Sequence, residues 1–142
     1  MLQDRQELLS NAQAFTATGV STDKYDTGMV ASKFGAGKAI GIAIAVTTAA
    51  DFTSANETYS FALCSDGDPA LGSPTVHEER AITAANLPLG AKHFIALDPN
   101  AECERYIGLR ATLGGTTPSV SITAALMTYE QFTTWKAYPN NY

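Results

Sequence analysis

The sequence has little charge, few cysteines and no long apolar run. Charged residues make up only 16% of its 142 positions, against about a quarter in typical globular proteins. The nine Lys and Arg are scattered through a chain of net charge −5, whereas a nucleic-acid binder gathers such residues against phosphates. No segment approaches the roughly 20 apolar residues of a membrane span. We therefore expect neither a nucleic acid nor a membrane as partner.

Residues that carry catalysis or bind metals are also scarce. The segment Met1–Glu7 lacks the basic and apolar regions of a secretory signal, so Cys64 and Cys103 are expected to be buried free thiols rather than a disulfide. The only histidines are His77 and His93, too few for a zinc-binding spacing. The chain also lacks a complete phosphate-binding loop and a serine nucleophile elbow. We expect no metal, no cofactor and no enzymatic activity.

Alanine and threonine are abundant, with 23 and 17 copies, and many of them alternate with larger apolar residues. Ile40, Ile42 and Ile44 fall on one face of an extended segment, opposite glycine and alanine. This period of two predicts β-strands. About eight such segments are separated by Gly, Pro and Asn turns: 13–18, 24–30, 38–47, 57–65, 76–82, 92–98, 105–113 and 119–127. The pattern predicts an all-β sandwich, most simply a jelly roll.

The strand pattern divides the chain into three parts. Residues 1–12 are expected to form an N-terminal arm or short helix that is dispensable for folding and could order on binding. Residues 13–128 would form the jelly-roll domain, and residues 129–142 an aromatic C-terminal tail. Aromatic side chains of this kind anchor interfaces. They suit equally a tail that covers the domain's own core, and the sequence leaves both alternatives open.

A resemblance to a known family appears at Leu9-Ser-Asn-Ala-Gln-Ala-Phe-Thr-Ala-Thr-Gly-Val-Ser-Thr-Asp23. This stretch resembles the N-terminal part of a family of tailed-phage capsid cement, or head decoration, proteins, although Asn11 stands where Asp is commoner. The similarity resumes at Asn86–Asp98 and continues through Glu104–Arg110 to Ala125. The resemblance implies a jelly roll that binds the outside of an icosahedral head and joins neighbouring capsomers.

The implied partners are the major capsid protein of a tailed phage and further copies of this chain, as a homo-oligomer of two or three. The implied location is the capsid surface, after synthesis in the host cytoplasm. For the interface we expect apolar residues of the N-terminal segment and of the tail: Leu8, Leu9, Phe15, Tyr129, Phe132, Trp135, Tyr138 and Tyr142.

Two other functions remain as alternatives. The first is a lectin-like jelly roll that recognises sugars through an exposed Trp135 and the tyrosines; retention on a glycan column without binding to heads would favour it. The second is a small hydrolase that uses His77, for which loss of a measured activity in His77→Ala would be the sign.

Overall fold

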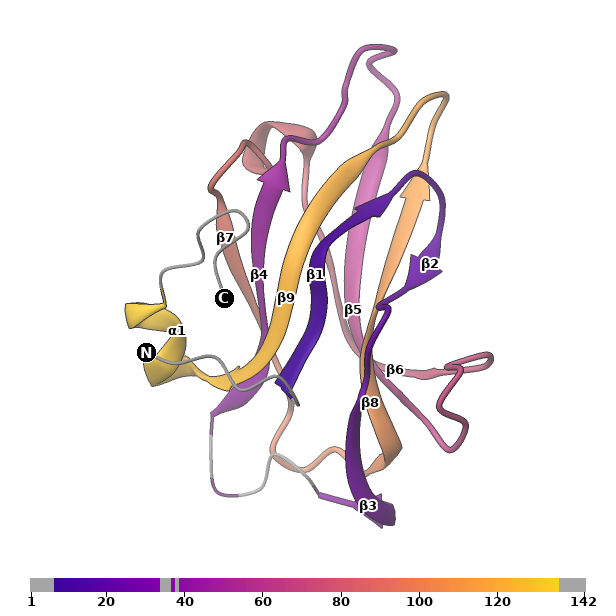
Figure 1. The fold of residues 1–142 in the computed structure, drawn as a ribbon, viewed down its shortest axis with the longest axis vertical. Helices are drawn as coiled ribbons and strands as arrows, with labels where there is room; N and C mark the ends of the chain where they lie inside the picture. Colours follow the sequence, from indigo (N-terminus) through magenta and orange to yellow (C-terminus); the bar gives the residue numbers. More distant parts are fainter. Residues whose placement is uncertain (1–6, 34–36, 38, 136–142) are drawn as a thin grey trace.

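The described part of the protein is an all-β sandwich of two antiparallel sheets with one short α-helix (Figure 1). A computed structural model describes residues 7–33, 37 and 39–135. The strands within these residues are β1 (Leu8–Phe15), β2 (Gly19–Val20), β3 (Tyr25–Ser32), β4 (Ile40–Thr48), β5 (Thr58–Asp66), β6 (Thr75–Ala81), β7 (Lys92–Ala96), β8 (Cys103–Gly114) and β9 (Val120–Thr128). The helices are the 3-10 turn η2 (Ala84–Asn86) and α1 (Tyr129–Thr134).

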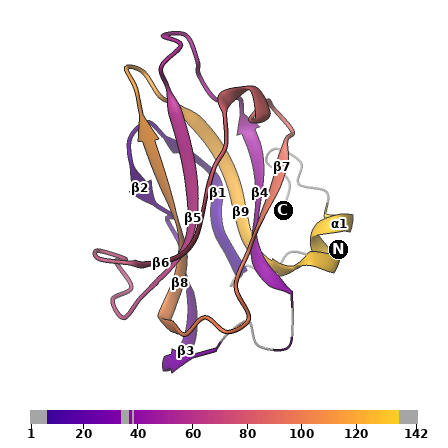
Figure 2. The same ribbon diagram turned by 180° about the vertical axis from the view of Figure 1, so that it is seen from behind.

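The strands form two layers. The first, called sheet I, has the order β1-β9-β4-β7; the second, sheet II, has the order β2-β8-β5-β6, and β3 also pairs with β8. Figure 1 shows β1 and β9 in front, and Figure 2 shows the sandwich from behind. All the pairings are antiparallel. The predicted all-β sandwich is thus confirmed, and the strand order is compatible with the jelly roll, which stays a prediction.

The main core lies between the sheets and follows the predicted alternation. Ile42 and Ile44 of β4 are fully buried there against residues of sheet II such as Phe61 and Leu109. The small residues between the isoleucines face the other way: Ala43 and Ala45 belong to a second apolar cluster on the outer face of sheet I. Burial of apolar area at about 25 cal/mol per Å² makes these two clusters the main source of stability.

The prediction of an arm or helix over residues 1–12 is wrong for residues 8–12. These residues form the first part of β1 and pair with β9, with Leu8 opposite Ala125. The adjacent leucines face opposite sides of the strand, so that Leu9 enters the main core and Leu8 the outer cluster. Because Leu9 is fully buried, deletion of residues 1–12 is now expected to unfold the domain. Residues 1–6 lie outside the described residues.

The first part of the tail packs on the domain. Thr128 and Gln131 form a capping box at the start of α1, which satisfies free amides at a helix N-terminus. Trp135 follows the helix and is buried in the outer cluster with Ala43, Ala45 and Met127. The alanines leave room for the indole, which explains the small outer face of β4. Tyr138 and Tyr142 lie outside the described residues.

Candidate interaction surfaces

Most of the residues predicted for an interface that the structure describes are buried within the protein itself. Leu9 and Phe15 lie in the main core, and Leu8 lies in the outer cluster with Trp135. Trp135 is only 5% exposed, so it offers no platform for a sugar, and the lectin alternative keeps only the tyrosines on which it also rested. Of the predicted residues that the structure describes, only Tyr129 and Phe132 reach the surface.

Tyr129 and Phe132 form an aromatic group with Phe94 of β7. Their ring centroids lie 5.2 to 6.0 Å apart, in the range of favourable ring pairs. The Lys92 ammonium donates a hydrogen bond to the carbonyl oxygen of Trp135 at 2.6 Å and lies 5.9 Å from the centre of the Phe132 ring. These contacts hold α1 against the edge of sheet I, and Tyr129 remains half exposed.

A surface that the sequence did not reveal is a bulge in β3. Asp26 is opposite Tyr106 and Ala31 is opposite Glu104, so residues 27–30 lie against Arg105 alone. The extra residues turn at Gly28, whose φ of +76° is unfavourable for other residues. Such an insertion bends a strand away from its ladder and redirects its side chains.

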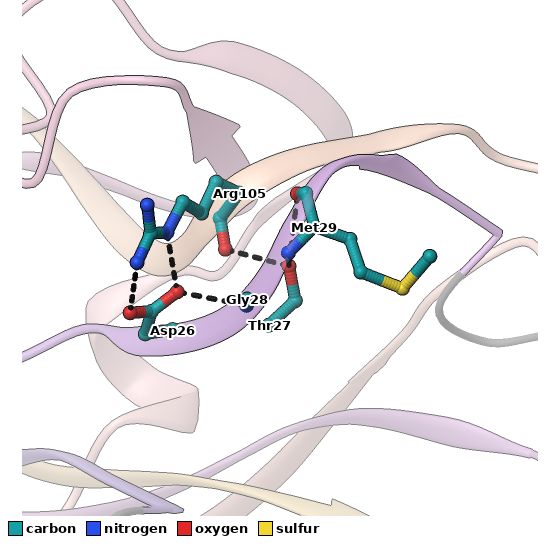
Figure 3. Close-up of polar contacts among 5 residues, drawn as sticks. All are labelled: Asp26, Thr27, Gly28, Met29 and Arg105. Atoms are coloured by element: carbon teal, nitrogen blue, oxygen red, sulfur yellow. Dashed lines mark hydrogen bonds and ion pairs between the residues drawn. The ribbon is translucent and has the colours of Figure 1, made fainter.

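Hydrogen bonds brace this bulge from both strands (Figure 3). Arg105 donates from Nε and a terminal nitrogen to the two oxygens of Asp26, at 2.8 and 3.0 Å, and the Gly28 amide donates to the same carboxylate at 2.8 Å. The Thr27 hydroxyl donates to the Arg105 carbonyl oxygen at 2.9 Å. The hydrogen bond from Arg105, followed by that from Gly28, lowers the pKa of Asp26. The geometry is therefore fixed most firmly when Asp26 is ionised.

The braced bulge presents two adjacent apolar side chains to solvent. Met29 is 56% exposed and Val30 is 87% exposed. Figure 3 shows the Met29 side chain extending away from the ion pair. These two neighbouring side chains on a fixed frame are therefore available for contact with another protein. The signal in the sequence is Asp26-Thr-Gly-Met-Val30, in which a glycine interrupts a strand.

A second apolar surface lies at the end of the sandwich formed by the β4–β5 connection and η2. A hollow of about 440 Å³ is lined mainly by apolar groups, including Phe52, Tyr59 and Ile82. Phe52 is half exposed. Glu57 is buried at its rim, and its carboxylate accepts hydrogen bonds from the amides of Ser54 and Asn56. This carboxylate therefore organises the loop.

His77, the residue of the hydrolase alternative, pairs with a serine. Its Nε2 lies 2.7 Å from the Ser65 hydroxyl, and burial lowers the pKa of His77. Ser65 is fully buried, and its hydroxyl oxygen accepts the Glu104 amide at 2.9 Å. A nucleophile needs an exposed hydroxyl beside its base. The geometry therefore favours a role in joining β5, β6 and β8.

Both cysteines are free and buried, as expected. Burial raises the pKa of Cys64 to about 11 and also raises the pKa of Cys103. Among residues 7–33, 37 and 39–135, no group of three or more His, Cys, Asp or Glu side chains is arranged to hold a metal ion. The helices in this part of the chain are too short and too polar to cross a membrane.

The fold and its surfaces define an all-β sandwich protein that carries a braced, apolar projection. A family model named Bbp16 matches residues 9–126, from β1 to β9, and the chain belongs to the Bbp16 family. The name of the family indicates a phage-related protein. The match includes the β3 bulge and leaves α1 outside. Comparison with curated proteins gives no match.

Proposed function

We propose that this protein is a structural component of a phage virion, a cement protein that binds the outer surface of the head and stabilises contacts between major capsid protein subunits. The observation that carries the proposal is membership of the Bbp16 family over residues 9–126. The resemblance of Leu9–Asp23 and Asn86–Asp98 to capsid cement proteins supports the same role.

The exposed surface of the β3 bulge supports a function that consists of binding to another protein. Met29 and Val30 provide apolar area on a frame held by the Asp26–Arg105 ion pair, so little conformational freedom would be lost on binding. Each contact need bury only a modest area, because contacts to several capsid subunits add their free energies when one chain bridges them. Low charge and many small side chains suit close packing among neighbours.

The proposed partners are the major capsid protein and further copies of this chain as a dimer or trimer. The proposed location is the exterior of the head. Light scattering of the purified protein measures the number of copies. A monomer at micromolar concentration would limit any oligomer to the head surface.

The test is binding to heads that lack this protein. Purified protein is titrated onto such heads, and bound protein is measured by sedimentation. We expect saturable binding and a higher temperature of head disruption. The Met29→Asp/Val30→Asp variant, which alters only exposed side chains, serves as the matched control and is expected to bind weakly. Wild-type protein that leaves heads bare and no more stable would contradict the proposal.

A further inference from the structure

Strand β7 is an open edge of sheet I, because it pairs with β4 and with no other strand in the described ranges. The hydrogen bonds at its two ends fix which backbone groups face β4. The Leu97 amide donates to the Ile40 carbonyl oxygen and the Val46 amide donates to the Ala91 carbonyl oxygen, both at 2.9 Å. In an antiparallel ladder, the backbone amides and carbonyls of alternate residues point away from the paired strand.

The residues that point away from β4 are therefore Lys92, Phe94 and Ala96. Their three amides and three carbonyls lie along the rim of the sandwich, where Figure 2 shows β7 beside β4 and none of the described strands on its other side. An edge of this kind is a template for one more strand. Lys92 does not shield it in the way edge lysines usually do, because its ammonium bonds to the Trp135 carbonyl oxygen.

A hollow of about 470 Å³ lies alongside this edge. On the outer side of the sheet it is lined by the aromatic group of Phe94, Tyr129 and Phe132. On the inner side it is lined by Arg80 of β6. Arg80 is opposite Phe61, a core residue, so its side chain starts on the face of β6 that looks toward sheet I.

The lining of this hollow is basic in an acidic protein. Among the described residues that line it, Arg80, Lys92 and His93 are basic and none carries a carboxylate, although the chain has a net charge of −5. Arg80 is exposed, and its guanidinium forms no hydrogen bond or ion pair with the residues that the structure describes. Its neighbour of opposite charge on the same face of β6 is Glu78, which does not line the hollow. The charge therefore favours an acidic occupant.

We propose that β7 accepts an extended, acidic segment of the partner protein as an additional strand of sheet I. Side chains of an added strand alternate between the faces of the sheet. Those on the outer face would meet Phe94, Tyr129 and Phe132, and are expected to be apolar or aromatic. Those on the inner face would meet Arg80, and are expected to include Asp or Glu. The identity of the partner as a capsid subunit rests on the function proposed above.

Two other occupants fit less well. A second copy that paired through the same edge would bring two sets of Arg80 and Lys92 into one interface, and like charges oppose such pairing. Residues 136–142 of the chain contain Lys136 and neither Asp nor Glu, so their side chains do not complement the basic lining. Both remain as outcomes of the test.

The first test removes one outward amide. Ala96→Pro deletes an N–H that β4 does not use, and proline is tolerated on the free side of an edge strand. Ala96→Val is the matched control, since it keeps the amide and adds similar bulk. We expect Ala96→Pro to lower affinity for heads about tenfold and Ala96→Val to bind like the wild type, with equal melting temperatures. Equal binding by both folded variants would overturn the proposal.

The second test measures amide hydrogen exchange of wild-type protein, free and bound to heads. We expect exchange at Lys92, Phe94 and Ala96 to slow by about tenfold or more on binding. Unchanged exchange in protein that is bound would overturn the added strand and leave the capsid role intact. Protein that binds no heads would instead contradict the capsid role.

The same measurement decides between occupants. Slow exchange of these amides in free, monomeric protein that becomes fast when residues 136–142 are deleted would assign the edge to the chain's own end. Slow exchange that depends on protein concentration would assign it to a second copy. Either result overturns the proposal.

Arg80→Gln is expected to weaken head binding about threefold and to reduce its salt dependence. An unchanged salt dependence would contradict the acidic character of the segment.

Discussion

The outer face of sheet I and the bulge of β3 both carry large apolar side chains, but one set is covered and the other is exposed. On sheet I, Ala43, Ala45 and Ala125 leave space that Trp135 fills. On β3, Met29 and Val30 stand on the Asp26–Arg105 frame with most of their surface in solvent. The difference separates side chains that stabilise the fold from side chains that are available to a partner.

The comparison also shows that residue type alone does not reveal an interface. Trp135 is the residue most typical of a binding hot spot, and yet it closes the protein's own sheet. Val30 is an ordinary strand residue, and it is the most exposed of the large apolar side chains that the structure describes. What distinguishes them is their position in the fold: Trp135 lies over alanines of sheet I, whereas Val30 lies on a bulge that leaves the ladder of sheet II.

The largest effect is expected for Trp135→Ala. The substitution leaves a cavity in the outer cluster where the indole packs, and it is expected to lower the free energy of unfolding by about 3–5 kcal/mol. Urea unfolding measures this loss. Tyr129→Ala, on the exposed side of the same helix, is the matched control and should cost far less. Similar losses in the two variants would mean that Trp135 does not cover the sheet.

The Met29→Asp/Val30→Asp variant tests the other side of the comparison. Because both side chains are exposed, the free energy of unfolding should change by no more than about 0.5 kcal/mol. Affinity for heads should fall at least tenfold, or about 1.4 kcal/mol. Sedimentation with heads and urea unfolding measure the two quantities. Unaltered affinity in the folded variant would rule out the bulge as a contact surface.

A smaller effect is expected from the ionisation of Asp26. Its pKa is lowered in the folded protein, so the bracing contribution is complete above the unfolded pKa of about 3.9 and is lost as the pH falls through the folded value. NMR signals of Gly28 and Met29 should stay constant from neutral pH to about pH 5 and change below about pH 4. Asp26→Asn should show the altered signals at every pH; a transition of the same size in that variant would exclude Asp26 as its source.

The smallest effect is expected for the two thiols. Burial raises the pKa of Cys64 to about 11 and raises that of Cys103, so neither is a reactive thiolate at neutral pH. A colourimetric thiol reagent at pH 8 should label neither cysteine in native protein and both after unfolding. Fast labelling of native Cys64 would show that the face of sheet II on which it lies is open.

The sequence predicted the fold class because alternation is a local property. The strands over Ile40–Thr48, Thr58–Asp66 and Val120–Thr128 lie within a residue or two of their predicted positions. The start of β1 was missed because Leu8 and Leu9 each have an apolar cluster on their own side of the strand. Two adjacent leucines among polar residues do not show the alternation that predicts a strand. Both are buried only because the sandwich has an apolar cluster on each side of β1.

The candidate surfaces were harder to predict, since they depend on pairing. The β3 bulge follows from an excess of residues between Asp26 and Ala31 relative to their partners on β8, which cannot be read before the register is known. The open edge of β7 follows from the order of strands in sheet I. The burial of Trp135 follows from alanines on two other strands.

The most direct test of the capsid role is electron cryomicroscopy of heads with and without this protein. We predict additional density on the outer surface that fits the two-sheet sandwich, with Met29 and Val30 against major capsid protein and a capsid segment along β7. Identical outer surfaces in the two preparations would contradict the account.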